Sequence, residues 1–355
     1  MPHSDNARTD NARQMRPRYC GGPCARLSCA RVNSNSANLP LVAVLATGGT
    51  IANTPSGRLH AGEVADAIPA LKSVARLEVE ELVRVASSAI GVEDWLTLAR
   101  RVNERLAEPG VKGVVVTHGS NTVEETGYFL SLTVKSNKPV VLTAAQRQFT
   151  TLSSDSPKNF LQAVRVAASD QARGKGALVV ANDVINAARD VSKNISTRVE
   201  TYSSRDIGAL GFVDDDQITF YRAPLKQHTL ATPFDAARLV KLPRVDIVYT
   251  YAGADGALIE ASVAQGAEGI VIAGFPTGVA TPVMEDAIRR AAARGIPVVM
   301  TNRGGMGRVM DKKREEARPL VWGDNLTPVK ARILLMLALT ATRDPVALQE
   351  MFEKY

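Results

Sequence analysis

The chain has 355 residues, 45% of them hydrophobic and 5% aromatic, with a formal net charge of +7. This length predicts about two domains with a substantial core. Residues 1–38 hold six arginines and two aspartates, so they carry +4 of the charge and leave +3 for the rest. Sparse aromatic residues and a nearly neutral body argue against a nucleic-acid partner. No apolar run reaches membrane-spanning length, so we expect no membrane contact.

The first 38 residues form a basic tail whose composition is typical of a solvated, disordered end. A tail of this kind could instead bind RNA or a membrane surface. All three cysteines, Cys20, Cys24 and Cys29, lie in it. Their spacing resembles half of a zinc site, but no other His or Cys clearly completes four ligands, so we expect no metal. The tail lacks an apolar core of signal-peptide length, which favours a cytoplasmic location over a periplasmic one.

The first chemical motif follows the apolar run Leu41–Ala46, which predicts a short buried strand. Gly48 and Gly49 then permit a tight turn, and Thr50 follows at once. In open α/β sheets, ligands bind at the carboxyl ends of strands. A hydroxyl there can attack a carbonyl if a neighbouring group takes its proton. A plain turn in which Thr50 caps the next segment would leave the same pattern.

A second motif repeats this arrangement at residues 114–122, which read Val-Val-Val-Thr-His-Gly-Ser-Asn-Thr. Glu124 and Glu125 come next, in the first turn of an expected helix, where acids suit the helix dipole. Two strand ends that each carry a hydroxyl predict a two-sided site. The alternative for Ser120 is helix N-capping, a position that serine favours.

After Pro40, strands and helices alternate along the chain. Residues 93–108 have apolar side chains at helical spacing. Apolar strands are expected at residues 111–116, 140–142 and 177–181, and this alternation predicts a parallel sheet. We expect an N-terminal α/β domain at 39–222, a proline-containing linker at 223–244 and a C-terminal α/β domain at 245–355. The expected elements of the last domain are strands at 245–251, 270–273 and 298–300 and a helix at 331–339.

The motif Thr47-Gly48-Gly49-Thr50-Ile51-Ala52 resembles the TGGTIA signature of bacterial-type L-asparaginases and glutaminase-asparaginases. Residues 118–122 resemble their HGTDT signature, with Ser120 and Asn121 as departures. Further matches follow in order at residues 95–99, 124–126, 138–141, 182–184, 189–193 and 330–335. The resemblance extends from Leu39 to Tyr355. It implies two parallel-sheet domains, the N-terminal one larger, and a homotetramer in which a neighbour's C-terminal domain completes each site.

The resemblance also implies a small-molecule amide substrate, no cofactor and specific roles for site residues. Thr50 matches the nucleophile, and Ser120 and Lys193 match a second catalytic cluster in which the lysine moves a proton. A lysine in a polar surface loop is the alternative for Lys193. The substrate-binding positions implied are Gly49, Ser87, Ser88, Gly119, Asn121 and Ala145. Ser87 and Ser88 could instead be a loop pair before a helix.

Several positions depart from the family pattern. Asn121 stands where the family has an aspartate that faces the substrate's α-ammonium, and the lost charge costs about 1.5–3 kcal/mol of binding. Lys193 loses its counter-ion at the same time. Residues 53–65 contain no tyrosine to help activate Thr50; His60 lies there as a substitute base or a surface histidine. The neighbour's segments read Phe275–Val279 and, in a looser alignment, Lys312, Lys313, Glu315 and Glu316.

Three functions fit these residues. The first, which we expect, is an L-asparaginase that releases ammonia through an acyl-enzyme on Thr50. The second is an amidohydrolase of the same family whose substrate lacks a free α-ammonium. The third is a catalytically weak homologue that binds a small molecule.

Overall fold

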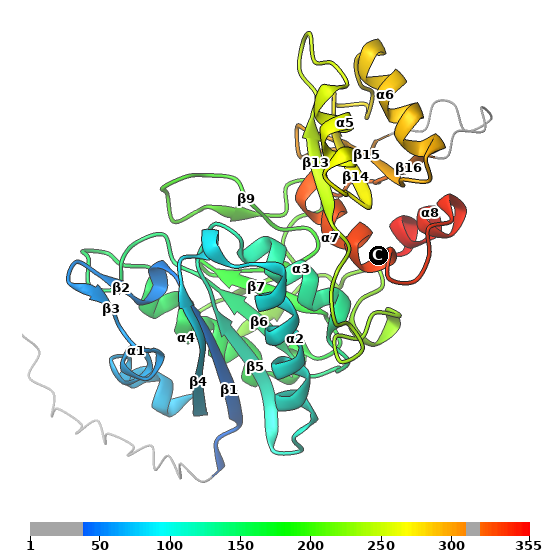
Figure 1. Cartoon of the computed structure of the whole chain (residues 1–355). Coiled ribbons are helices and arrows are strands. Elements are labelled where there is room, and N and C mark those ends of the chain that lie inside the picture. The colour runs from blue at the N-terminus through cyan, green and yellow to red at the C-terminus, as the bar shows by residue number, and fades with distance from the viewer. Residues whose placement is uncertain (1–37, 310–319) are drawn as a thin grey trace, which may run out of the picture. The chain divides into compact units, whose positions relative to one another are not determined.

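The computed structural model describes residues 38–309 and 320–355 (Figure 1). Its larger sheet has eight strands in the order β12-β11-β8-β7-β6-β5-β1-β4. These strands are β1 (Leu41–Gly48), β4 (Arg76–Val85), β5 (Val111–Thr117), β6 (Val140–Thr143), β7 (Ala177–Ala181), β8 (Val184–Ala187), β11 (Gly211–Val213) and β12 (Ile218–Phe220). The helices of this part are α1 (Ala61–Asp66), α2 (Val92–Ala107), α3 (Val123–Thr133) and α4 (Ser156–Ala168). The expected larger α/β domain is confirmed.

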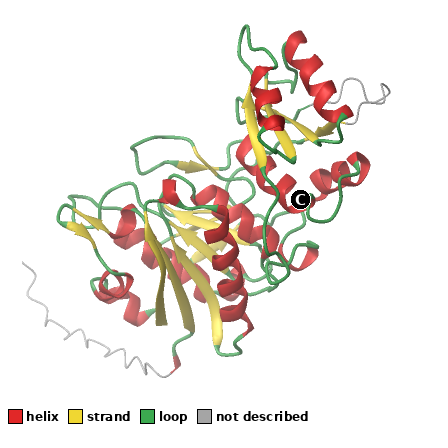
Figure 2. Ribbon diagram, in the orientation of Figure 1, coloured by secondary structure: helices red, strands yellow, loops and turns green. Residues whose placement is uncertain are grey.

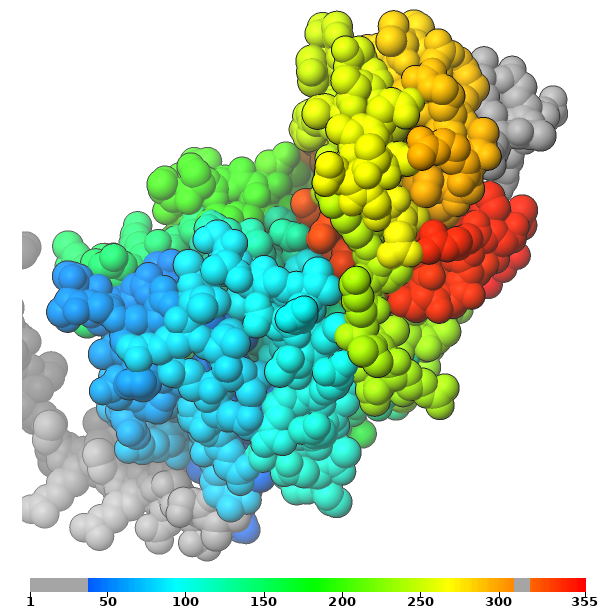
Figure 3. Space-filling model, in the orientation of Figure 1, coloured from blue at the N-terminus to red at the C-terminus, as the bar shows by residue number. Residues whose placement is uncertain are grey.

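Alternate residues of β1 face opposite cores, which explains its continuous apolar sequence. Ala43 and Leu45 pack with α2 and α3 on one face. Val42 and Val44 pack with α4 on the other. The strands therefore lie between two helical layers (Figure 2), and α2, in cyan, covers much of one face in the space-filling view (Figure 3).

The parallel part of this sheet comprises β4, β1, β5, β6 and β7. The strands β8, β11 and β12 continue it in antiparallel fashion, an extension that the sequence pattern did not predict. The reason is local: β7 and β8 are joined by Asn182 and Asp183, with φ angles of 50° and 66°. A two-residue turn with positive φ at both positions makes a hairpin, which reverses the chain.

The smaller sheet is parallel throughout, in the order β13-β14-β15-β16. Its elements are β13 (Val245–Tyr249), β14 (Gly269–Gly274), β15 (Val298–Asn302), β16 (Leu320–Trp322), α5 (Ala257–Ala264), α6 (Pro282–Ala293), α7 (Pro328–Ala338) and α8 (Pro345–Lys354). Helices α5 and α6 share one core with this sheet. Helix α7 packs on its other side and also contacts α3. The second, smaller α/β sheet expected from the sequence is thus confirmed.

The remaining elements of the described chain are short. They are the hairpin β2 (Asn53–Thr54) and β3 (Gly57–Arg58), the pair β9 (Ser192–Lys193) and β10 (Tyr202–Ser203), and five 3₁₀ turns: η2 (Thr50–Ala52), η3 (Pro69–Ser73), η4 (Ser87–Ala89), η5 (Asp170–Ala172) and η6 (Thr229–Ala231). Within the part of the chain that the structure describes, no helix is both long enough and apolar enough to cross a membrane.

Candidate active site

The two glycine-containing motifs meet at one edge of the larger sheet. Strands β1 and β5 are parallel neighbours, with Ala46 opposite Thr117, so both motifs leave the sheet side by side. Gly49 has a φ of 91°, and a β-carbon built on it would lie 2.3 Å from the Cα atom of Gly119. Only glycine can occupy position 49, because a side chain would be both strained and blocked. This contact brings the turn of Thr50 against the loop of Ser120.

Ser87 joins them from the third neighbouring strand, β4. A β-carbon on Gly119 would lie 2.6 Å from the Ser87 hydroxyl oxygen. That hydroxyl accepts a hydrogen bond from the Asn121 N–H at 3.1 Å, and the Thr122 hydroxyl donates to the Ser87 carbonyl at 2.9 Å. Ser87 is buried whereas Ser88 is exposed. Three strand ends thus place Thr50, Ser87 and Gly119 around one point.

Thr50 is half-buried and begins the turn η2. Its carbonyl accepts the N–H of Asn53, which fixes the backbone of the turn. Among residues 38–309 and 320–355, no group hydrogen-bonds the Thr50 hydroxyl.

Ser120, Asn121 and Lys193 form a cluster beside this turn. The Lys193 ammonium donates to the Ser120 hydroxyl at 2.8 Å and to the Asn121 amide oxygen at 3.1 Å. No carboxylate in the described parts of the chain makes an ion pair with Lys193. Partial burial lowers the pKa of Lys193, because the charged form is less well solvated there. A lysine with a lowered pKa, bonded to a hydroxyl, can take up and return a proton.

Two residues that the motifs did not single out for this purpose hold Lys193 in place. The Glu124 carboxylate accepts the backbone N–H of Lys193 at 3.1 Å. Tyr202 pairs with Lys193 across β9 and β10, and its hydroxyl donates to the Ser120 carbonyl at 3.1 Å. The sequence marked Glu124 as an acid in the first turn of a helix and as part of a family match at 124–126, without assigning it a site role, and no pattern identified Tyr202.

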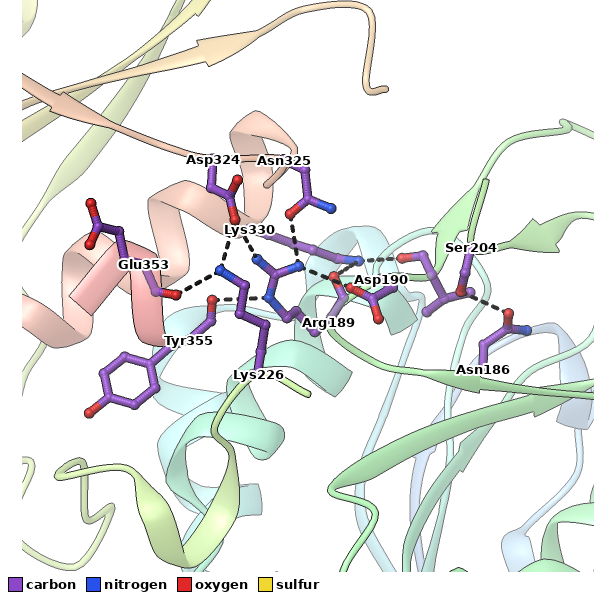
Figure 4. A network of polar contacts seen from close by, with 11 residues as sticks. Asn186, Arg189, Asp190, Ser204, Lys226, Asp324, Asn325, Lys330, Glu353 and Tyr355 are labelled. Atoms are coloured by element: carbon purple, nitrogen blue, oxygen red, sulfur yellow. Dashed lines mark hydrogen bonds and ion pairs between the residues drawn. The ribbon is translucent and has the colours of Figure 1, made fainter. Parts of the chain in front are cut away.

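Lys330 supports residues 189–191, the segment that leads to Lys193 (Figure 4). This lysine of α7 is buried, and its ammonium donates to the carbonyls of Arg189, at 2.8 Å, and of Val191. Arg189 in turn donates to the Asn325 side chain at 2.9 Å and to the Tyr355 carbonyl at 3.0 Å. Burial lowers the pKa of Lys330 to about 8. A network of contacts from the C-terminal part of the chain thus holds residues 189–191.

His118 in the second motif is a structural residue. Its ring is buried, and its Nδ1 and Nε2 atoms lie 2.8 Å from the Gly119 carbonyl and 2.9 Å from the Thr126 hydroxyl. The carbonyl can only accept, so Nδ1 carries the proton and Nε2 accepts from Thr126. Trp95 donates to the same hydroxyl at 2.9 Å. Burial lowers the pKa of His118 to about 4, which keeps the ring neutral at pH 7.

His60 lies on the surface, at the start of α1. Its side chain is 62% exposed, and its two ring nitrogens lie 3.2 Å from Glu81 and 3.2 Å from Arg84. No contact between His60 and Thr50 occurs in the described chain. These contacts fit the surface interpretation of His60 better than that of a substitute base.

The other expected positions are spread along the chain. Ala145 is buried just after β6, next to β5 in the same sheet. Phe275–Val279 follows β14 in the smaller domain. The three cysteines, the tail and the positions Lys312, Lys313, Glu315 and Glu316 lie outside the described residues. No group of three or more His, Cys, Asp and Glu suited to a metal occurs within 38–309 and 320–355.

Comparisons with known proteins agree with these motifs. Residues 41–226 match the family model for the asparaginase N-terminal domain, and residues 244–352 match that for the glutaminase/asparaginase C-terminal domain. L-asparaginase 2 of Bacillus subtilis is 41% identical over 347 residues, covering 94% of this chain and 92% of that protein. A probable periplasmic L-asparaginase of Haemophilus influenzae is 38% identical, covering 91% and 95%.

Among solved structures, that of a probable cytoplasmic L-asparaginase from Campylobacter jejuni has a TM-score of 0.86 and 40% identity, covering 89% of this chain and 100% of that one. The similarity in sequence and in fold spans both sheets and both motifs. The chain belongs to the asparaginase family.

Proposed function

We propose that this protein hydrolyses a side-chain amide and releases ammonia, with L-asparagine as the first substrate to consider. The family and the names of its relatives support this reaction. The observation that carries it here is the convergence of Thr50, Ser87 and the Ser120–Lys193 pair at one sheet edge. The enzyme is thus a hydrolase of linear amides.

In the proposed reaction, the Thr50 oxygen attacks the amide carbon and the C–N bond breaks, which leaves an ester on Thr50. The amide nitrogen leaves as ammonia after it gains a proton. Water then cleaves the ester, adds its oxygen to the acyl group and restores the Thr50 hydroxyl. Ser120 and Lys193 form the second catalytic cluster, in which the lysine takes up and returns the transferred proton.

The substrate's charged end would lie against the backbone and hydroxyl groups around Gly119. We assign substrate binding to Gly49, Ser87, Ser88, Gly119, Asn121 and Ala145. Asn121 would face the part of the substrate that carries the ammonium in asparagine. Because its amide supplies no negative charge, asparagine loses about 1.5–3 kcal/mol of attraction there.

A second function is favoured by the Lys193–Asn121 contact. Here the substrate is an amide of the same size that lacks a free α-ammonium, so that no carboxylate is needed at position 121. The Lys193 side chain, which has no ion-pair partner in the described chain, would then tolerate or attract an anionic substrate.

Replacement of the nucleophile tests both functions. Thr50→Ala should abolish ammonia release from L-asparagine and from N-acylated and deaminated amides, while the melting temperature stays within a few degrees. Thr50→Ser, which keeps the hydroxyl, is the matched control and should retain measurable turnover. Activity that persists unchanged in Thr50→Ala would remove Thr50 from the mechanism.

We further propose a homotetramer with shared active sites, a cytoplasmic location and a domain division at residues 223–244. One relative is named as periplasmic and one solved structure as cytoplasmic. Fractionation of cells that produce the protein would test its location. Light scattering on the purified protein, with activity followed through dilution, would test the assembly.

A further inference from the structure

A short hairpin beside the Thr50 turn places an arginine against that turn. Strands β2 and β3 pair Asn53 with Arg58. The Nε atom of Arg58 donates to the Asn53 side-chain oxygen at 2.8 Å. The backbone N–H of Asn53 donates in turn to the Thr50 carbonyl. The guanidinium of Arg58 is therefore held two hydrogen bonds away from the backbone of the proposed nucleophile.

The same guanidinium lies over the first glycine of the turn. A β-carbon on Gly48 would be 3.2 Å from the Nη1 atom of Arg58 and 2.6 Å from the Val85 carbonyl oxygen. Val85 ends β4, two residues before Ser87. Arg58 thus lies close to the segment that carries Thr50 and to the end of β4, which leads to Ser87, one of the residues assigned to substrate binding.

Arg58 has unused hydrogen-bonding capacity. Its side chain is half-buried, yet within residues 38–309 and 320–355 its Nη atoms have no acceptor and no carboxylate lies within 4.0 Å of it. A guanidinium presents donors in a planar fork that matches a carboxylate. Held through Nε alone, Arg58 keeps its outer donors available for such a group.

The charges around the two motifs are unbalanced. The Lys193 ammonium contacts only the neutral groups of Ser120 and Asn121, while Glu124 binds the Lys193 backbone N–H. The Arg58 guanidinium donates only to the neutral side chain of Asn53. Neither cation has a carboxylate partner in the described chain. Two cations without compensation favour a substrate with a net negative charge.

We propose that Arg58 binds a carboxylate of the substrate, and that the preferred substrate is the monoamide of a dicarboxylic acid without an α-ammonium. This inference rests on the proposed amide hydrolysis and selects its second form. Succinamic acid is the simplest such compound. Its C–N bond breaks, ammonia leaves, and water supplies the oxygen of the second carboxylate in the product succinate.

Three substrates separate the groups involved. L-Asparagine has both the carboxylate and the ammonium, succinamic acid has only the carboxylate, and 3-aminopropanamide has only the ammonium. Wild-type kcat/KM should be higher for succinamic acid than for L-asparagine. Arg58→Gln should raise KM about tenfold or more for both carboxylate substrates and leave kcat/KM for 3-aminopropanamide within about twofold. Arg58→Lys should restore part of the loss.

Arg84→Gln is the matched control. It removes a neighbouring exposed guanidinium, which contacts His60 and the Arg58 carbonyl, and should change KM by less than about twofold for all three compounds. If Arg58→Gln lowers kcat/KM equally for all three substrates, Arg58 shapes the turn or pairs with a protein carboxylate. This result would overturn its role in binding the substrate carboxylate. A wild-type preference for L-asparagine would overturn the substrate class.

A binding measurement tests the role of Arg58 independently of whether the protein hydrolyses an amide. Succinate should raise the melting temperature of the wild-type protein and of Thr50→Ala, and should fail to do so in Arg58→Gln. If no amide is hydrolysed, the proposed function fails, and this shift still decides the role of Arg58. A succinate shift that is undiminished in Arg58→Gln would overturn the inference.

Discussion

The ammonium of Lys193 lies 3.1 Å from the amide oxygen of Asn121, a position at which the family signature has a carboxylate. The lysine keeps a hydrogen-bond acceptor there and loses a counter-ion. On the proposed assignment, substrate preference and the proton affinity of Lys193 depend on the same residue, so one substitution should change both.

Asn121→Asp should have opposite effects on the two substrate classes. KM for L-asparagine should fall about tenfold, because a carboxylate at position 121 adds one charge-assisted bond to the α-ammonium. KM for succinamic acid should rise, since the new carboxylate faces a group that cannot pair with it. Steady-state ammonia release measures both. If neither value changes, Asn121 does not face the substrate.

The same substitution should move the acidic limb of the pH profile. If neutral Lys193 accepts the proton, kcat/KM falls as the pH drops through the pKa of Lys193, which burial lowers. A carboxylate within 4 Å stabilises the ammonium, so Asn121→Asp should shift this limb upward by about one unit or more. Asn121→Ala adds no charge and should not shift it upward. An identical limb in all three proteins would exclude Lys193 as the group that titrates.

Gly49→Ala should destabilise the protein by about 3 kcal/mol or more and abolish activity. The added methyl group would overlap the backbone of Gly119 and would force alanine into a φ of 91°. Thermal and urea unfolding measure the loss. Gly62→Ala in α1, where nothing lies within 4 Å of the new methyl, is the control and should be neutral or slightly stabilising. A stable, active Gly49→Ala protein would contradict the contact between the two motifs.

Lys330→Met should lower stability and kcat together. Loss of the ammonium leaves the buried carbonyls of Arg189 and Val191 without this donor, at a cost of about 2–4 kcal/mol. The segment that places Lys193 should then loosen, so that kcat falls about tenfold while KM changes little. Lys330→Arg should rescue part of the loss. The control Lys354→Met removes an exposed partner of Glu350 and should have no effect on kcat. An unchanged kcat in Lys330→Met would show that the hydrogen bonds of Lys330 do not determine the position of Lys193.

His118 should make the fold sensitive to acid. Its pKa is about 4 in the folded protein against 6.5 in the unfolded chain, so the unfolded state binds the proton more readily. This contribution to stability is complete above pH 6.5 and is lost as the pH falls toward 4, a change of about 3 kcal/mol. Unfolding measured from pH 7 to pH 4 should show a smaller decline in His118→Gln, in which the titrating group is gone. Equal declines in both proteins would place the acid sensitivity elsewhere.

The sequence alone predicted the features that depend on residues close together in the chain. The apolar run before Gly48 predicted a buried strand, and β1 packs its alternate residues on two helical layers. The alternation of strands and helices predicted both α/β sheets. The resemblance of residues 47–52 and 118–122 to two signatures predicted the family. These properties are readable because strand burial and turn chemistry are set by neighbours in the chain.

Tertiary structure decided the partners of the site residues. Tyr202 reaches Ser120 across 82 positions of sequence, and Lys330 reaches Val191 across 139. Tyr202 and Arg58 carry no pattern that marks them, and their contacts follow from which strand each one pairs with. Strand order, register and helix packing determine such contacts, and these depend on the whole chain rather than on any segment of it.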